Sequence, residues 1–540
     1  MNRRKFIQNT ALGGVALTSV SLPSCQPQAV SAEQPDASYA SEKFELEEIT
    51  VAQMQQAMEE DRYTAEAITR LYLARIEKID KAGPALNSII ELNPDALSIA
   101  QKLDEERAAG KVRGPLHGIP VMLKDNIDTG DQMQTTAGSL ALEGHRAGED
   151  ATIVQQLRDA GAIILGKTNL SEWANFRSTR SSSGWSSRGG QTRNPYSLNR
   201  NPCGSSSGSG AAVSANLCML TIGTETNGSI VCPSNANGIV GIKPTLGLLS
   251  RNGIIPIAHS QDTAGPMART IADAVTMLGT MTATDSKDTE TQSPARKAFA
   301  DYTQFLDAES LQGKRIGIWR GAMGFHEKVD ALMEDAVRLM EEKGAIVVDV
   351  EEVTSGESLG QAGFDVLLYE FKADLNQYLA EHTNAPRRSL EEIIAFNKAN
   401  ADRAMPYFQQ EILAMAQEKG DLDTAEYREA LEKIKLACGR EGIDKVMQEH
   451  QLDAIAAPTG GPAWPIDLIT GDHGLGGSSS PAARAGYPNI TVPNGFVHNL
   501  PVGISFFGKA WSEPVLIGIA YAYEQGSQHR QPPKFLEQAV

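Results

Sequence analysis

The stretch that decides the fold is Cys203-Gly-Ser-Ser-Ser-Gly-Ser-Gly-Ala-Ala-Val213, which ten residues separate from Thr224-Glu-Thr-Asn-Gly-Ser229. It offers two separate hydroxyl groups, Ser205 and Ser229, and each stands near glycines. Because glycine has no Cβ, the carbonyl group of a substrate can approach the backbone closely at both places. The small apolar residues from Ala211 to Leu220 are typical of a tightly packed helix behind a glycine loop.

A lysine stands upstream of this stretch in an unusual setting. The apolar run Pro120-Val-Met-Leu123 predicts a buried strand, and Lys124 follows at its end. Burial disfavours the charged form of a lysine and lowers its pKa, so a buried Lys124 can serve as a base. The alternative is a surface lysine that pairs with Asp125 or Asp128.

Alternating helical and strand patterns extend on both sides. Residues 45–111 are predicted to be helical, with a capping box at Thr50-Val-Ala-Gln53. Further helices are predicted at 327–343, 386–450 and 513–524. Short apolar runs predict strands at 162–165, 315–319, 345–350, 454–457, 489–492 and 502–506. This alternation predicts an α/β fold with a helix-flanked sheet, and no linker divides residues 45–540.

Composition excludes some classes of partner. The chain has 540 residues, of which 41% are hydrophobic and 21% are charged, as in an ordinary soluble enzyme. Its net charge is −18, and Lys and Arg cluster only at the N-terminus. Phosphate binding would need clustered basic residues, so no nucleic-acid partner is expected.

The N-terminal residues 1–25 have the pattern of a targeting segment. Arg3-Arg4-Lys5-Phe6 resembles a twin-arginine export signal, and the apolar run that follows is shorter than the roughly 20 residues of a membrane span. Leu22-Pro-Ser-Cys25 is similar to a lipoprotein cleavage site, and the sequence leaves open whether Cys25 carries lipid. The composition of residues 26–44 predicts a flexible linker. We expect an exported protein that is periplasmic or tethered to a membrane outside the cytoplasm.

The remaining cysteines and the histidines show no metal-ligand spacing. Cys203, Cys218, Cys232 and Cys438 form no C-x-x-C pair, and the nine histidines are scattered. We interpret these thiols as small buried packing residues, with a disulfide between Cys203 and Cys232 left open. No metal and no organic cofactor are expected.

Two short motifs are decoys. Residues 161–168 match the phosphate-loop spacing G-x4-G-K-T, but the residues between the glycines themselves form a predicted strand. Residues 204–208 match G-x-S-x-G, the nucleophile elbow of α/β-hydrolases, which follows directly on a buried strand. Here a loop, residues 194–202, precedes it. An esterase of that fold, with His498 as its histidine, is therefore a minor alternative.

Several motifs in order resemble the amidase signature family. They are Gly118–Asp128, the loop Gly204-Ser-Ser-Ser-Gly208, the loop Thr224-Glu-Thr-Asn-Gly-Ser-Ile230, Gly238–Thr245, Asp262–Arg269, Ala485–Pro488 and Leu500–Gly503. The resemblance covers about residues 45–530 and implies one amidase domain with a central mixed β-sheet flanked by helices.

The resemblance also implies a role for each site residue. Ser229 would be the acylated nucleophile, Ser205 the bridging serine after a cis peptide bond, and Lys124 the ultimate base. The backbone N–H groups of Thr226, Asn227, Gly228 and Ser229 would form the oxyanion hole. Asn227 and Gly228 both tolerate left-handed dihedral angles, which favours a nest of such N–H groups.

Departures from the commonest family pattern bear on the substrate. Glu225 replaces an Asp, Asn227 a Gly, and Val231-Cys232 the usual Arg and its neighbour. These forms, together with Ser171-Glu-Trp-Ala-Asn-Phe176, are similar to the branch of bacterial peptide amidases, which release ammonia from peptide C-terminal amides. Trp173, Asn175 and Phe176 either line the substrate cleft or pack in the core.

The expected function is thus hydrolysis of carboxamide C–N bonds through a Ser–cis-Ser–Lys triad and an acyl-enzyme, with the C-terminal amides of peptides as substrates. One alternative is a general aryl or aliphatic amidase of the same family. Another is the amidase-like subunit of a tRNA-dependent amidotransferase, which the export signal and the acidity disfavour. The expected partner is a small-molecule or peptide amide substrate.

Overall fold

A mixed sheet of eleven strands lies at the centre of the computed structural model, which describes residues 44–539. The strands follow the order β1-β3-β2-β6-β8-β7-β12-β13-β11-β9-β10. Their bounds are β1 Ile89–Leu92, β2 Pro120–Lys124, β3 Ile163–Thr168, β6 Leu220–Glu225, β7 Val240–Lys243, β8 Thr263–Ala268, β9 Arg315–Trp319, β10 Ile346–Val350, β11 Ala454–Pro458, β12 Asn489–Val497 and β13 Leu500–Phe507. Strands β4 (Trp185–Ser186) and β5 (Gly190–Gln191) form a separate two-stranded sheet.

The pairing explains why β2 is apolar up to Lys124 at its end. Strand β2 lies between β3 and β6 and is parallel to both, and all five of its residues are buried. Strands with both faces covered are continuous hydrophobic runs rather than alternating ones. Antiparallel pairs connect β6 through β8, β7, β12 and β13 to β11, and β11, β9 and β10 are again parallel.

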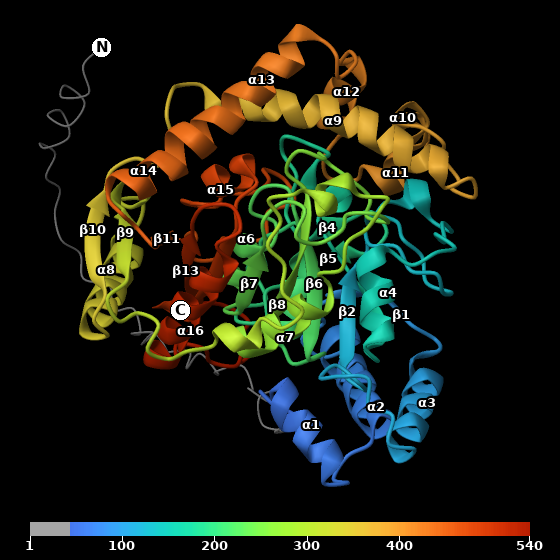
Figure 1. The fold of residues 1–540 in the computed structure, drawn as a ribbon. Coiled ribbons are helices and arrows are strands. Elements are labelled where there is room, and N and C mark those ends of the chain that lie inside the picture. The colour runs from blue at the N-terminus through green and yellow to red at the C-terminus, as the bar shows by residue number, and fades with distance from the viewer. Residues whose placement is uncertain (1–43, 540) are drawn as a thin grey trace, which may run out of the picture. The chain divides into compact units, whose positions relative to one another are not determined.

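Helices cover this sheet (Figure 1). Helices α5 and α6 contact each other and the strands, and α16 with its neighbours α7 and α8 forms another such group. Helix α9 runs across the top of the view in Figure 1, with α13 beside it. The bounds are α1 Val51–Glu59, α2 Ala65–Ile76, α3 Ala96–Ala108, α4 Thr152–Asp159, α5 Ser207–Ser214, α6 Val231–Ala236, α7 Ile271–Thr280, α8 Glu327–Glu342, α9 Leu359–Glu381, α10 Leu390–Ala399, α11 Ala401–Ala404, α12 Glu411–Glu418, α13 Ala425–Lys435, α14 Asp444–Glu449, α15 Ser480–Ala485 and α16 Glu513–Ser527.

Shorter helical turns complete the architecture. Turns of π-helix extend α2 over Glu77–Lys81 and α13 over Leu436–Ile443. Turns of 3₁₀-helix are found at Leu140–Leu142, Glu172–Asn175, Thr289–Gln292, Thr303–Phe305 and Arg320–Ala322.

The structure confirms the α/β class, the single large domain and the mixed sheet. The capping box at Thr50 and Gln53 is present at the start of α1. One prediction was wrong in part: β1 interrupts the helical region 45–111, because it pairs with β3 at the sheet edge. The decoy 161–168 is indeed strand β3, and no strand directly precedes residues 204–208.

The predictions for residues 1–25, for Cys25 and for most of the linker 26–44 lie outside the described residues. Within residues 44–539, no helix combines the length and the apolar character that crossing a bilayer requires.

Candidate active site

Lys124 lies at the carboxyl end of β2, fully buried. Its Nζ donates hydrogen bonds to Ser205 Oγ at 2.7 Å and to Thr224 at the end of β6, with Oγ1 at 2.8 Å and the carbonyl oxygen at 3.1 Å. Asp125 instead accepts hydrogen bonds from Thr136 Oγ1 and from the backbone N–H of Gly138. The surface alternative for Lys124 is therefore wrong.

This environment sets the charge of the lysine. Burial lowers the pKa of Lys124 to about 7, although the negative charges of Asp262 and Glu225 act in the opposite direction. Asp262 is itself buried, which raises its pKa to about 6. Near neutral pH a large fraction of Lys124 is therefore neutral and can accept a proton from the Ser205 hydroxyl.

Ser205 stands just before helix α5, and the Gly204–Ser205 peptide bond is cis. Its carbonyl oxygen accepts a hydrogen bond from the N–H of Ser171 at 3.1 Å. The neighbouring Ser206 uses its hydroxyl differently: Oγ accepts from the Thr224 N–H at 3.2 Å and donates to the Thr224 carbonyl at 3.1 Å. Ser206, the elbow serine of the esterase alternative, is thus bound to the backbone of β6.

Ser229 lies in the loop between β6 and α6, 9% exposed. Its carbonyl oxygen accepts a hydrogen bond from the Ser206 N–H at 3.2 Å, which joins the two serine loops. Glu225 Oε2 accepts from the N–H groups of Ile230 at 2.8 Å and Val231 at 3.1 Å. The longer Glu in place of the usual Asp thus anchors the chain directly after Ser229.

The N–H groups of Thr226, Asn227, Gly228 and Ser229 find no hydrogen-bond acceptor within residues 44–539. Gly228 has a φ of 87°, whereas Asn227 is outside the left-handed region, so of these two residues only Gly228 uses the left-handed conformation that both tolerate. The side chain of Asn227 instead accepts a hydrogen bond from Ser479 Oγ at 2.9 Å. Four unpaired donors around a serine can bind the oxygen of a polarised carbonyl.

A disulfide joins the two serine loops. Cys203, two residues before Ser205, is bonded to Cys232, three residues after Ser229, with their Cα atoms 6.0 Å apart. The packing interpretation was therefore wrong for this pair. It holds for Cys218 and Cys438, which are free and buried.

The aromatic segment before the site packs in a core. Trp173 is 2% exposed and lies edge-on to Phe371 of α9, and Phe176 packs against the same ring. Asn175 Oδ1 accepts a hydrogen bond from Ser181 Oγ at 2.9 Å. Of this turn, Ala174 rather than these three residues lines the neighbouring cavity.

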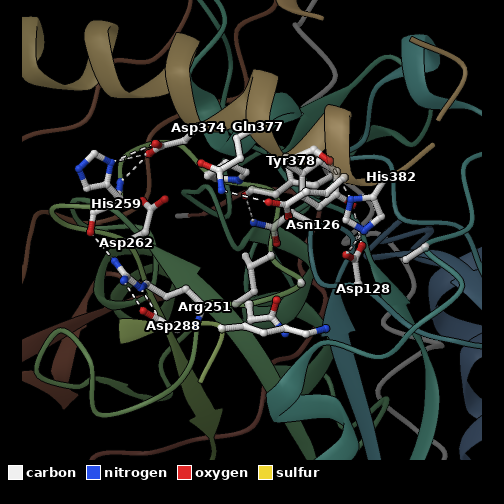
Figure 2. Close-up of a pocket in the computed structure, with 18 of the residues that line it drawn as sticks. Asn126, Asp128, Arg251, His259, Asp262, Asp288, Asp374, Gln377, Tyr378 and His382 are labelled. Carbon is white, nitrogen blue, oxygen red and sulfur yellow. Dashed lines mark hydrogen bonds and ion pairs between the residues drawn. The ribbon is translucent and has the colours of Figure 1, made fainter. Parts of the chain in front are cut away.

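That cavity has a volume of about 1120 Å³ and reaches the site at Asn126, Thr224, Thr226 and Asp262. Figure 2 shows Asn126 and the α9 residues Asp374, Gln377 and Tyr378 around it. Asn126 Nδ2 donates to Thr224 Oγ1 at 3.0 Å, while its buried Oδ1 has no partner within residues 44–539.

Three contributors to this site were not predicted from the sequence. Thr224 and Asn126 stand inside the quoted motifs, but nothing in the sequence assigned them a contact with each other or with Lys124. The contribution of α9 had no sequence signal, because the helix is distant along the chain.

Within residues 44–539, two groups of His and carboxylate side chains could hold a metal ion. One consists of Asp128, His145 and His382, and the other of His259, Glu370 and Asp374.

Comparison with known proteins shows what this chain is similar to. The family model described as Amidase matches residues 67–517. The solved structure of native peptide amidase from Stenotrophomonas maltophilia is 50% identical, with a TM-score of 0.88, and the match covers 91% of this chain and 100% of that one. A probable amidase from Arabidopsis thaliana is 41% identical over 92% of this chain and 93% of its own. One subunit of the glutamyl-tRNA(Gln) amidotransferase from Symbiobacterium thermophilum is 33% identical over 87% of this chain and 97% of its own.

Proposed function

Since the chain belongs to the amidase family and is a hydrolase that acts on amides, we propose that it removes the C-terminal amide of peptides. The observation that carries the proposal is the hydrogen bond of 2.7 Å between the buried Lys124 Nζ and Ser205 Oγ. This contact supports Lys124, whose pKa is lowered to about 7, as the base that acts on Ser205.

In the proposed mechanism Ser229 is the nucleophile. Neutral Lys124 accepts the proton of Ser205, and Ser205 in turn accepts the proton of Ser229 while Ser229 Oγ attacks the amide carbonyl carbon. The N–H groups of Thr226, Asn227, Gly228 and Ser229 stabilise the resulting oxyanion. Collapse breaks the C–N bond, and the proton held by the relay passes to the departing amine, which leaves as ammonia. Water then attacks the acyl-enzyme with Lys124 again as base, and the carboxylic acid is released.

A peptide amide suits this arrangement for three reasons. The adjoining cavity, of about 1120 Å³, is at the upper end of ordinary ligand pockets and can accommodate several residues of an acyl chain. Half of the residues are identical to those of a peptide amidase across the full length of that enzyme. Ammonia as the leaving group requires little space beyond Ser229.

A substrate panel tests the proposal. Peptide carboxamides, aryl amides, fatty amides and matched esters are incubated with the enzyme, and ammonia, amine or alcohol release is measured. We expect peptide carboxamides to give the highest kcat/KM, without added glutamine or partner subunits. Fast turnover of aryl or fatty amides with none of peptide amides would instead favour a general amidase. Turnover of glutamine only, and only with partner subunits, would favour the amidotransferase function.

We also propose export, from Arg3-Arg4 and the apolar run that follows. Fractionation of cells that express the full chain should place the enzyme outside the cytoplasm, and Arg3→Lys with Arg4→Lys should retain it inside. If the parent and the Arg3→Lys, Arg4→Lys variant were found in the same cell fractions, export through this signal would be contradicted. Labelling with a fatty-acid analogue, with Cys25→Ser as the control, decides whether Cys25 carries lipid.

A further inference from the structure

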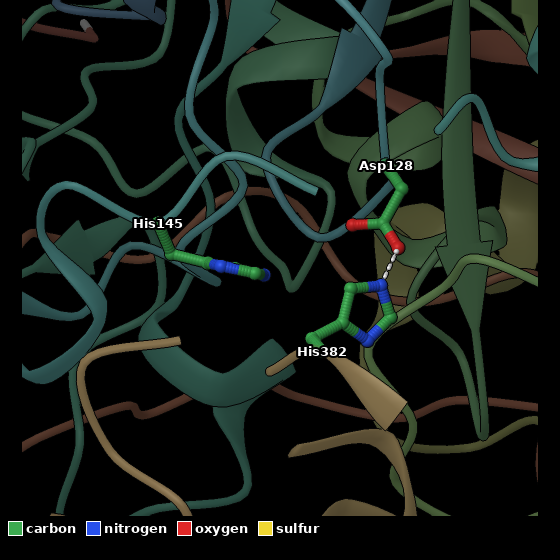
Figure 3. Close-up of side chains that lie close together, drawn as sticks. All are labelled: Asp128, His145 and His382. Carbon is green, nitrogen blue, oxygen red and sulfur yellow. Dashed lines mark ion pairs between the residues drawn. The ribbon is translucent and has the colours of Figure 1, made fainter. Parts of the chain in front are cut away.

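Three side chains of the kinds that can ligate a metal ion lie close together, although they come from separate segments (Figure 3). Asp128 follows strand β2, His145 follows the turn Leu140–Leu142, and His382 caps the C-terminus of α9. One candidate ligand atom from each lies within 4.8 Å of the others. Asp128 and His382 also line the cavity. None of the three takes part in the proposed amide chemistry.

The pair Asp128–His382 already has the geometry of two ligands. His382 Nδ1 lies 2.8 Å from the carbonyl oxygen of Tyr378. A carbonyl only accepts, so Nδ1 carries a hydrogen, and Nε2 forms an ion pair with Asp128 Oδ2 at 3.1 Å, in which a metal ion would replace the Nε2 proton. Two ligands about 2.0–2.1 Å from a tetrahedral zinc ion lie roughly 3.3 Å apart. Little movement is therefore needed for both to bind one ion.

The surrounding hydrogen bonds match those of ligating residues. A metal-bound histidine usually donates its other N–H to a carbonyl or carboxylate, as His382 does to Tyr378. The Tyr378 hydroxyl donates to Asp128 Oδ1 at 2.8 Å and fixes the carboxylate. Oδ2 thus remains directed at His382.

His145 supplies the third position. It is fully buried, and its Nε2 lies 3.2 Å from the Tyr378 hydroxyl oxygen. The single hydroxyl hydrogen goes to Asp128, so His145 Nε2 carries the hydrogen in that contact. Its Nδ1 therefore has a lone pair, and Nδ1 is buried without a hydrogen-bond partner in the described part of the chain.

The cavity provides an entry path and an attractive field. Its wall carries eight Asp and Glu side chains against two of Arg and Lys, which favours cations. A metal site needs such a path, and a three-ligand site keeps a fourth position for water.

We propose that Asp128, His145 and His382 bind one divalent transition-metal ion of the zinc type, with Tyr378 holding the ligands. The ion connects the end of α9 to the segment after β2, on the wall of the substrate cavity. It is a modulator and not a cofactor: when bound, it narrows the cavity and slows turnover, and a chelator restores the rate.

Isothermal titration of the chelator-treated full chain with ZnCl₂ tests the proposal, and Co²⁺ serves as a spectroscopic probe. We expect one equivalent to bind, and Co²⁺ to show visible bands of a low-coordinate nitrogen and oxygen site. His382→Gln and, separately, Asp128→Asn should weaken binding by at least about tenfold, on the scale of losses at ligand-supporting positions. His259→Gln, at the other His–carboxylate group, is the matched control and should bind as the parent does.

Turnover provides a second readout. ZnCl₂ should inhibit the parent and the His259→Gln variant, and EDTA should restore the activity of both. The His382→Gln variant should be inhibited only at a much higher ZnCl₂ concentration. Circular dichroism shows whether each variant folds. If His382→Gln does not fold, Asp128→Asn still tests the site, because its amide oxygen can accept the hydrogen bond of the Tyr378 hydroxyl. No stoichiometric binding, or binding that both substitutions leave unchanged, would overturn the proposal.

Discussion

At the scale of single residues, the chemistry depends on where Lys124 stands. An amide carbonyl is a weak electrophile, so the attacking hydroxyl needs a base. We propose that Lys124, at the end of a strand that is buried on both faces, is this base, because desolvation lowers its pKa to about 7. Thr224 accepts two hydrogen bonds from Lys124 Nζ, through its carbonyl oxygen and Oγ1, and so satisfies the buried amine without adding a negative charge.

Removal of any member of this relay should nearly abolish turnover. Ser229→Ala and Lys124→Ala are each expected to lower kcat on the order of 10⁴-fold or more, since such residues act as a unit. Ser205→Ala should act in the same direction and leave more residual rate. Ser206→Ala is the comparison, because that hydroxyl binds only the backbone of β6. A Ser229→Ala enzyme with most of its activity, beside an inactive Ser206→Ala enzyme, would favour the esterase-type elbow.

The pH profile should report the lysine. Lys124 is a base only when it is neutral, so kcat/KM should rise with pH through about 7 and then level off. Below that value each pH unit should cost about tenfold, because the neutral fraction falls by that factor. The measurement is kcat/KM for a peptide amide of constant charge, from mildly acidic to mildly alkaline pH. A profile that falls as pH rises through neutrality would contradict the role of Lys124.

At the scale of elements, the loop between β6 and α6 is held by Glu225. Its carboxylate accepts two N–H groups directly after Ser229. Glu225→Gln keeps one oxygen acceptor and should retain more activity than Glu225→Ala, in which we expect kcat to fall about 10²-fold through misplacement of Ser229. KM should change less than kcat. Equal activity of both variants and the parent would show that the loop keeps its shape without this anchor.

The disulfide between Cys203 and Cys232 holds the same two loops together. A double Cys203→Ser, Cys232→Ser variant should lose about 2–4 kcal/mol of unfolding free energy, the usual contribution of such a cross-link. The kcat of the variant should fall as well. Reductant should lower the unfolding free energy of the parent but not that of the variant. Denaturant unfolding with and without reductant is the measurement. Identical curves for the two proteins would contradict a structural role.

Much at this scale was predictable, and the exceptions have physical causes. Strands β2, β9 and β11 have local apolar patterns, and the prediction identified them. Strand β1 was missed because its pairing with β3 outweighs the helical pattern around it. The motifs identified Lys124, Ser205 and Ser229 as candidates, whereas Thr224, Asn126 and α9 enter the site through contacts between distant segments. The scattered histidines showed no ligand spacing, yet the fold brings His145 and His382 together.

At the scale of the whole molecule, one sheet carries the complete site. Lys124 ends β2, and the neighbouring β6 leads through Thr224 and Glu225 into the loop of Ser229. Helix α5 begins just after Ser205, and α9 lines the cavity from its other side. In the proposed mechanism, a single domain thus combines a proton relay, a set of N–H donors and a large cavity, which together favour an acyl transfer to water.

The most direct test of this account is the intact mass of an amidated peptide after incubation with the enzyme. We predict conversion of the terminal amide to the acid, release of one ammonia per peptide, and no internal fragments. The Ser229→Ala enzyme should leave the same peptide unchanged. Internal cleavage, or conversion that continues undiminished in the Ser229→Ala enzyme, would contradict the account.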